Sequence, residues 1–138
     1  KEVVDFGVQV AKLAAEDAAA QTRLATTLQN VTGATKAQTQ AVEDYILKTS
    51  LANGVTDDKL RPSLDRLVRS TQNVAEAQKS QALALDISAG TGKDLESVTN
   101  ALAKAHDGQF TALKRLGVSI DESVLNRYFV LIPSKFVS

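Results

Sequence analysis

The apolar residues of this chain recur mainly three and four positions apart, as in amphipathic helices, and seldom alternate as in strands. Gly, Asn and Asp residues interrupt the pattern at intervals, as they commonly do where helices end. The pattern predicts an all-α protein in which a long N-terminal helix is followed by a bundle of short helices joined by Gly-bearing turns. We expect no sheet before residue 124.

The first helix is expected to span about thirty residues, because that stretch lacks Pro and is rich in helix-forming residues. Its apolar residues fit a seven-residue repeat that is interrupted by Asp17. Such a seam is typical of a coiled coil between copies of the chain, in which Asp17 would weaken association and fix the register. An amphipathic helix packed within its own domain has the same pattern, so both interpretations stay open. The seam consists of Val3, Phe6, Val10, Leu13, Asp17, Ala20, Leu24 and Val31.

Caps and turn residues set the expected bounds of the shorter helices. Thr35 and Gln38 have the spacing of a capping box, which predicts that the second helix begins there. Asn53 and Gly54 end it, because both residues tolerate the left-handed backbone that terminates helices.

Thr56 is a suitable N-cap, and Asp57 and Asp58 place negative charge where a first helical turn favours it, so a helix start is expected there. Because Pro62 would break an established helix, we expect only a short turn up to Arg61 and the proper helix from Pro62 onward. Helices are thus predicted over residues 35–52, 62–71, 74–89, 94–106 and 109–116.

Apolar stripes on these helices predict their buried faces. In the second helix the stripe leaves Glu43, Asp44 and Lys48 facing outward. Residues available for close packing in the segment 74–89 are Ala75, Ala82, Leu85 and Ala89. The other expected stripe residues are Val42, Tyr45, Ile46 and Thr49, then Leu60, Leu64, Leu67 and Val68, and then Leu95, Val98, Leu102 and Ala105.

The character of the sequence divides the chain into three parts. Residues 1–31 form the long helix, residues 32–122 a helical domain, and residues 123–138 an apolar tail. We expect the tail to be a short strand or a fragment that is not contiguous with the rest in the parent sequence. Because the chain has no Met and no signal-like segment, we expect it to be an internal piece of a longer protein.

Sixteen basic side chains balance sixteen acidic ones, so the chain lacks the positive field that draws proteins to nucleic acids or anionic membranes. We therefore expect no specific nucleic-acid binding, and membrane contact stays open. The absence of Cys excludes disulfides and thiolate metal sites. No apolar run approaches the roughly 20 residues that a membrane-spanning helix needs.

Residues 88–94, SAGTGKD, resemble the phosphate-binding loop of nucleotide-binding enzymes in composition. The spacing is wrong, because Ile87 stands where the first Gly is needed. Asp94 stands where a Ser or Thr would hold magnesium. The preceding segment is also predicted as a helix, whereas the motif follows a strand, so a helix–turn–helix interpretation is favoured over a nucleotide site.

No other residue group predicts chemistry. His106, the single histidine, is expected to satisfy carbonyl groups at a helix end rather than to bind a metal ion. Three serines lack the Gly-flanked turn and the His partner of a hydrolase nucleophile, namely Ser63, Ser70 and Ser80. We therefore expect a protein that is not an enzyme, with no catalytic residue, no metal site, no cofactor and no small-molecule ligand.

The charged residues near Pro62 are interpreted as a solvated helix face rather than a basic recognition helix. Nearby acidic residues neutralise them, and Asp65 with Arg69 forms an i,i+4 pair of the kind common on helix surfaces. A polar contact with another protein is the alternative interpretation. The basic residues concerned are Lys59, Arg61, Arg66 and Arg69.

Several blocks of the chain resemble a segment of the tape-measure proteins of tailed bacteriophages. They are NGVTDDKLRP at 53–62, LVRST at 67–71, ALDISAGTGKDL at 84–95, ALAKA at 101–105 and LKRLGV at 113–118. Their order and spacing are similar to the family pattern over residues 33–122, about two thirds of the chain. Residues 124–138 depart from that pattern.

The resemblance implies a long, helical structural protein of the virion that lies in the tail tube, sets tail length during assembly and leaves ahead of the DNA. It implies synthesis in the bacterial host cytoplasm and partners that are other copies of the chain, with three copies favoured, and tail tube and tail tip proteins. It supplies no active-site residue. The alternative is a helical protein-interaction module of a bacterial secretion or signalling assembly, for which balanced charge and a self-associating helix also serve.

Overall fold

The computed structural model describes residues 2–117, and within the first helix it describes side chains from residue 11 onward. No strand occurs in these residues, which confirms the all-α prediction for the part of the chain described. The predicted apolar tail lies outside it. The helices are α1 (Glu2–Thr32), α2 (Lys36–Asn53), α3 (Asp57–Thr71), α4 (Val74–Thr91), α5 (Leu95–His106) and α6 (Thr111–Arg115).

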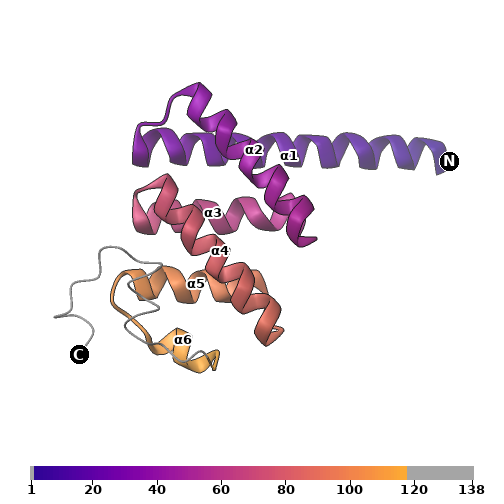
Figure 1. The fold of residues 1–138 in the computed structure, drawn as a ribbon. Coiled ribbons are helices and arrows are strands. Elements are labelled where there is room, and N and C mark those ends of the chain that lie inside the picture. The colour runs from indigo at the N-terminus through magenta and orange to yellow at the C-terminus, as the bar shows by residue number, and fades with distance from the viewer. Residues whose placement is uncertain (1, 118–138) are drawn as a thin grey trace.

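The helices form two layers (Figure 1). α1, α3 and α5 lie side by side and run in the same direction, and α2 and α4 cross them on one face. α3 is central, because it packs against α1, α2, α4 and α5. Successive helix pairs are thus stacked one upon the next, in the manner of helical repeat proteins, where each pair buries its apolar face against its neighbours.

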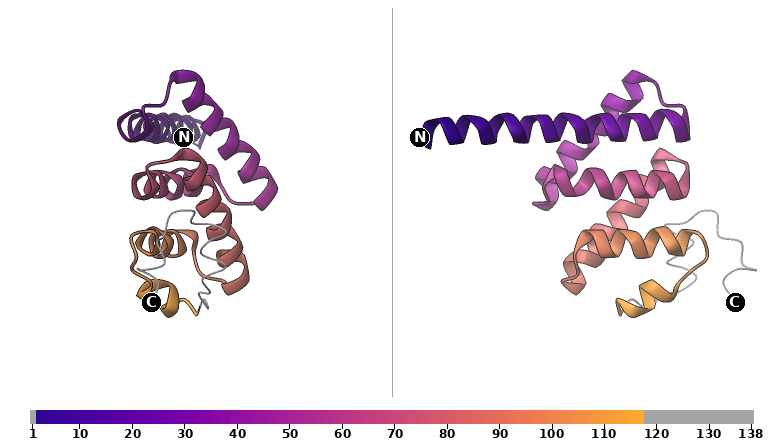
Figure 2. Two further views of the ribbon diagram at one scale, coloured as in Figure 1. Left: turned by 60° about the vertical axis from the view of Figure 1, so that its left-hand side comes forward. Right: turned by 180° about the vertical axis from the view of Figure 1, so that it is seen from behind.

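α1 extends well beyond this stack. Figure 2 shows its N-terminal half projecting past the ends of the other helices, while its C-terminal half lies against α3. The side chains of residues 11–19 are all exposed, and from residue 11 onward the first buried side chain of α1 is Leu24. We call residues 2–16 the rod.

The apolar stripes predicted for α2, α3 and α5 line one continuous core. Tyr45 and Thr49 of the predicted stripe are half-buried, and its other members are buried. Leu24 and Leu28 of α1 enter the same core, so the C-terminal half of α1 folds with the other helices. The most deeply buried large apolar residues are Leu24, Leu28, Ile46, Leu60, Leu64, Leu67, Val68, Val98, Leu102 and Leu113.

Local sequence accounts for most helix ends. The capping box at the start of α2 is confirmed, since the backbone N–H of Gln38 donates to Thr35 Oγ1 at 3.1 Å and that of Thr35 donates to Gln38 Oε1 at 2.8 Å. α2 ends at Gly54, whose φ of 65° is the left-handed conformation that Gly adopts at low cost. The turn after α3 has no Gly, and Gln72 takes this conformation instead, with φ of 57°.

The helix start expected at Thr56 is confirmed, since Thr56 is the N-cap of α3 and the helix begins at Asp57. Three other expectations on helix bounds were wrong. α3 does not break at Pro62 but continues through it, with Leu60 and Leu64 fully buried on either side of an exposed proline ring. Its first turn is closed by the N–H of Leu60, which donates to Thr56 O at 3.2 Å. α4 includes Gly90 and ends at Thr91, and α6 is shorter than predicted, at five residues.

The predicted packing face of α4 was also wrong in part. Ala75, Ala82 and Ala89 are exposed, and only Leu85 of the expected residues is buried. The helix instead turns a mixed face inward, on which Gln81 is hydrogen-bonded and the buried Ser80 hydroxyl has no hydrogen-bond partner among the described residues. The buried residues are Ala77, Ser80, Gln81, Ala84 and Leu85.

Candidate functional site

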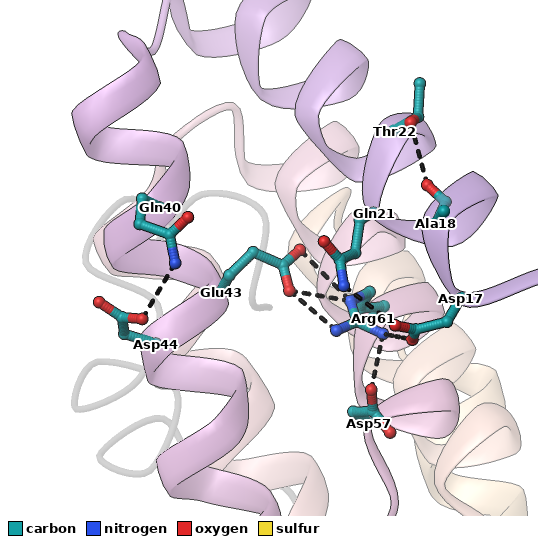
Figure 3. Close-up of polar contacts among 9 residues, drawn as sticks. All are labelled: Asp17, Ala18, Gln21, Thr22, Gln40, Glu43, Asp44, Asp57 and Arg61. Carbon is teal, nitrogen blue, oxygen red and sulfur yellow. Dashed lines mark hydrogen bonds and ion pairs between the residues drawn. The ribbon is translucent and has the colours of Figure 1, made fainter. Parts of the chain in front are cut away.

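The most unusual feature of the structure is a buried arginine at the meeting point of three helices. Arg61 of α3 is 6% exposed, and three carboxylates surround its guanidinium (Figure 3). Its Nη1 donates to Asp17 Oδ1 of α1 and to Asp57 Oδ2 of α3, both at 2.8 Å. Its Nε donates to Glu43 Oε1 of α2 at 3.0 Å, and Nη2 lies 2.9 Å from the same oxygen. We call these four residues the Arg61 junction.

The junction keeps Arg61 charged. Burial by itself lowers the pKa of the guanidinium, but the hydrogen bond and charge of Glu43, the hydrogen bond of Asp57 and the charge of Asp17 together raise it above its ordinary value. Asp17 and Asp57 remain about half exposed, so water shares in solvating their charges. The junction therefore ties α1, α2 and α3 together through one side chain that would be costly to bury without its partners.

The sequence interpretation of this region was wrong at two residues. Arg61 was assigned to a solvated surface and Glu43 to the outward face of α2, yet both are largely buried. Arg61 binds Glu43, which lies 18 positions away in the sequence, and Asp17, which lies 44 positions away. No local spacing reveals such pairs. The predicted i,i+4 pair is confirmed, with Arg69 Nε 3.1 Å from Asp65 Oδ1, although only Arg69 is exposed and Asp65 is largely buried.

Buried polar contacts hold the stack together elsewhere. The Tyr45 hydroxyl donates to Gln81 Oε1 at 2.9 Å, and Gln81 Nε2 donates to Leu60 O at 2.9 Å, which joins α2, α4 and α3. Ser63 Oγ and Thr99 Oγ1 share a hydrogen bond of 2.6 Å between α3 and α5. The serine hydroxyl thus has a structural role. Sequence reasoning did not single out Gln81 or Thr99, because each partner lies on a separate helix.

Two open grooves lie on the face formed by α1, α3 and α5. The first, of about 540 Å³, runs between α1 and α3 beside Arg23 and Pro62. The second, of about 720 Å³, runs between α3 and α5 and is lined by three basic and three acidic side chains. That balance favours no ligand of one charge. Its charged residues are Asp58, Lys59, Arg66, Arg69, Asp94 and Glu96.

The structure divides the predicted seam of α1 at Asp17. On the C-terminal side Leu24 is buried in the core of the same chain, and Ala20 and Val31 are half-buried. On the N-terminal side Leu13 is 63% exposed. The side chains of three seam residues lie outside the described residues, namely Val3, Phe6 and Val10.

Within residues 11–117, two other large apolar side chains are exposed, and both belong to α2. Leu47 is 60% exposed and Leu51 is 78% exposed. They follow Glu43 by one and two turns along the same flank of α2. Leu13 precedes Asp17 by one turn on α1. The exposed leucines therefore continue the two helix faces that meet at the Arg61 junction.

Residues 88–94 form a helix–turn–helix connection. α4 precedes the turn, Gly92 has φ of 73°, and Ser97 N–H donates to Asp94 Oδ2 at 3.2 Å as α5 begins. Hydrogen bonding by the Ser97 side chain, and then by its backbone N–H, lowers the pKa of the Asp94 carboxyl below its ordinary value. A capping carboxylate thus occupies the place where the nucleotide motif needs a magnesium-binding hydroxyl.

The remaining candidates show no cluster. His106 is half-buried in the last turn of α5, and burial lowers its pKa. Within residues 2–117 no three His, Asp or Glu side chains gather in a way that would hold a metal ion. Among the helices described, none has the combination of length and hydropathy that crossing a bilayer requires.

Comparisons with protein-family models, with curated proteins and with solved structures found no match to this chain.

Proposed function

We propose that this chain is a structural segment of a bacteriophage tail tape-measure protein, which sets tail length from within the tail tube and leaves ahead of the DNA. Its partners would be other copies of itself, three in the arrangement that the family resemblance implies, together with tail tube and tail tip proteins. The virion would be its site of action.

The observation that carries the proposal is the shape of α1. A helix that runs on past its own domain, with exposed side chains over residues 11–19, is suited to join neighbouring segments of a longer helical protein. The resemblance over residues 33–122 supplies the family. The stack of α2–α6 is broader than a single helix, so the length-determining part of this segment would be the rod.

A helical interaction module of a bacterial secretion or signalling assembly is the second candidate. The exposed Leu47 and Leu51 favour it, because apolar side chains grouped on a surface often mark a protein contact. If the chain is such a module, changing the length of the rod should not change the length of any particle.

Inserting heptads into the rod of the parent protein tests the two functions. Four extra heptads, about 28 residues, placed between Val10 and Ala11 add about 42 Å of helix. A tape measure predicts tails longer by about 42 Å in electron micrographs of the assembled particles.

A matched insertion of the same number of Gly and Ser residues after Gly54, in the turn before α3, is the control. It adds chain but no helix to the rod, so tail length should stay unchanged. Tails of unaltered length with both insertions would contradict the proposal and favour the interaction module.

A further inference from the structure

Each half of α1 contains a triplet of apolar residues, and the two triplets have the same spacing. Leu24, Leu28 and Val31 make up the face that packs on α3 and the core. Eighteen positions earlier, which is about five turns of helix, the sequence has Phe6, Val10 and Leu13. Because eighteen positions are five full turns, Leu13 lies on the same side of α1 as Val31. α3 begins opposite Asp17, so nothing in the described structure lies beneath the rod.

The end of α2, which carries Leu47 and Leu51, leaves the stack near the rod. Asp17 and Glu43 bind the same guanidinium, which fixes α1 and α2 close together there. From that point the N-terminal half of α1 and the C-terminal half of α2 both lead away on the same side of the molecule (Figure 1). The rod and the end of α2 thus form the two sides of a corner. All three exposed leucines of the described side chains belong to these two segments, namely Leu13 on the rod and Leu47 and Leu51 on α2.

We propose that this corner is a docking site for a second copy of the chain, whose rod lies in it against Leu47 and Leu51. In the C-terminal half of α1, α3 covers an apolar triplet with this spacing. An apolar helix surface of another copy therefore suits the triplet of the rod. In a pair related by a two-fold axis each copy gives one rod and one corner. Three copies make the same contact as a ring, each rod lying in the corner of the next copy.

The size of the contact fits a stable interface. Fifteen rod residues form a cylinder about 22 Å long and about 10 Å wide, so covering half of its side removes about 350 Å² from water. In the two-fold pair, counting both surfaces of its two contacts gives about 1,400 Å², within the about 1,200–2,000 Å² of stable interfaces. In a ring each neighbouring pair shares one contact of about 700 Å², so the two-fold pair is the arrangement whose interface has the stable size.

The rods alone are too short to associate as a coiled coil. Asp17 is held by Arg61 of its own chain, and Leu24 is buried beyond it, so the seam open to another copy ends at Leu13. Fewer than two heptads remain, whereas coiled coils are sustained over about three or four. The end of α2 supplies the additional apolar surface. This inference does not depend on the phage-tail proposal, since it concerns the chain in isolation.

Cross-linking between copies tests the contact directly, because the natural chain has no Cys. Leu13→Cys and Leu51→Cys are purified as separate full-length proteins, one isotopically labelled, then mixed and treated with a short bifunctional maleimide. We expect a product that joins residue 13 of one copy to residue 51 of the other. Ala41→Cys replaces Leu51→Cys in the control, since Ala41 is exposed on another face of α2. Equal yields from the two mixtures would overturn the proposal.

Light scattering at increasing protein concentration gives an independent result. The natural chain should form dimers or trimers, and the double variant Leu47→Glu/Leu51→Glu should raise the dissociation constant at least about a hundredfold, because two central apolar contacts are lost. Both positions are exposed, so circular dichroism should show an unchanged helical fold, and Ala41→Glu should associate normally. A natural chain that is monomeric at every concentration, or a double variant that associates as well as the natural chain, would contradict the docking site.

Discussion

The C-terminal half of α1 and its rod differ in surroundings rather than in sequence pattern. Leu28 is fully buried against the stack, whereas Leu13, in the other triplet, is 63% exposed. Both halves are helical, and each contains Ala, Leu and Gln, which favour helix. What separates them is the position at which α3 begins. An apolar stripe thus predicts a face that needs a partner, but the partner itself depends on where other elements end.

The same comparison can be made between the whole stack and the rod. The helices of the stack bury their apolar faces within the chain, whereas the rod does not. Changes in the stack should alter the free energy of unfolding, and changes in the rod should alter association only. Paired substitutions should differ most in the free energy of unfolding at α5, less on α1 and less again within the Arg61 junction. The effect of pH on the free energy of unfolding should be the smallest.

Leu102→Asp should unfold the protein. Leu102 is fully buried, and an unpaired charge there costs more than about 4 kcal/mol, a large part of the total stability of an ordinary domain. Lys93→Ala, in the exposed turn before α5, should change the free energy of unfolding by less than about 0.5 kcal/mol. Urea denaturation followed by circular dichroism measures both. Equal tolerance of the two substitutions would show that the packing of α5 has been misassigned.

Leu28→Ala and Leu13→Ala compare the two halves of α1 with the same chemical change. Leu28→Ala should lower the free energy of unfolding by about 2.5–5 kcal/mol, because it leaves a cavity in the core. Leu13→Ala should lower it by less than about 0.5 kcal/mol in dilute protein, where the rod has no partner. A similar cost for both would mean that the rod packs within its own chain.

Glu43→Gln and Asp17→Asn test how burial divides the Arg61 junction. Glu43, with 14% of its side chain exposed, makes charged hydrogen bonds, so Glu43→Gln should cost about 1.5–3 kcal/mol. Asp17 is 47% exposed and screened by water, so Asp17→Asn should cost less than about 1 kcal/mol. Both values come from urea denaturation at low salt, and the reverse order would contradict the assigned roles.

Acid should destabilise the stack through His106. Its folded-state pKa lies below the ordinary value of 6.5, because burial disfavours the charged form while Asp107 and Glu76 oppose the shift. The unfolded chain then binds a proton first, so stability falls as the pH drops from 6.5 to the folded pKa. His106→Gln should flatten that part of a plot of unfolding free energy against pH. The contribution of Asp94, whose pKa is also lowered, is lost only below its ordinary value of 3.8, so it does not obscure the test.

Local patterns predicted the helices and most of the core. The capping box at Thr35 and the stripe through Leu60 and Leu64 depend only on residues within one or two turns, so the sequence contains the whole signal. The break at Pro62 was predicted from the one backbone hydrogen bond that a proline removes from a helix. The packing of α3 against α1, α4 and α5, which stabilises the helix on both sides of Pro62, could not be included.

Long-range partners could not be predicted. Arg61 was placed among solvated charges, since Asp17 and Glu43 are brought to it only when three helices pack. The coiled-coil seam was a sound description of spacing, but spacing does not say where α3 begins. Leu28, which the seam omitted, is fully buried, so the packed face of α1 follows the helical period of 3.6 residues more closely than the heptad.

The stack covers the C-terminal half of α1, and another copy is proposed to cover the rod. Hydrogen exchange of backbone amides tests this arrangement most directly when the full-length chain is compared at low and at high protein concentration. We expect amides of residues 20–32 to be protected at both concentrations, and amides of residues 4–16 to be protected strongly only at high concentration. Protection of the rod that equals that of residues 20–32 in dilute protein, or that does not change with concentration, would contradict the account.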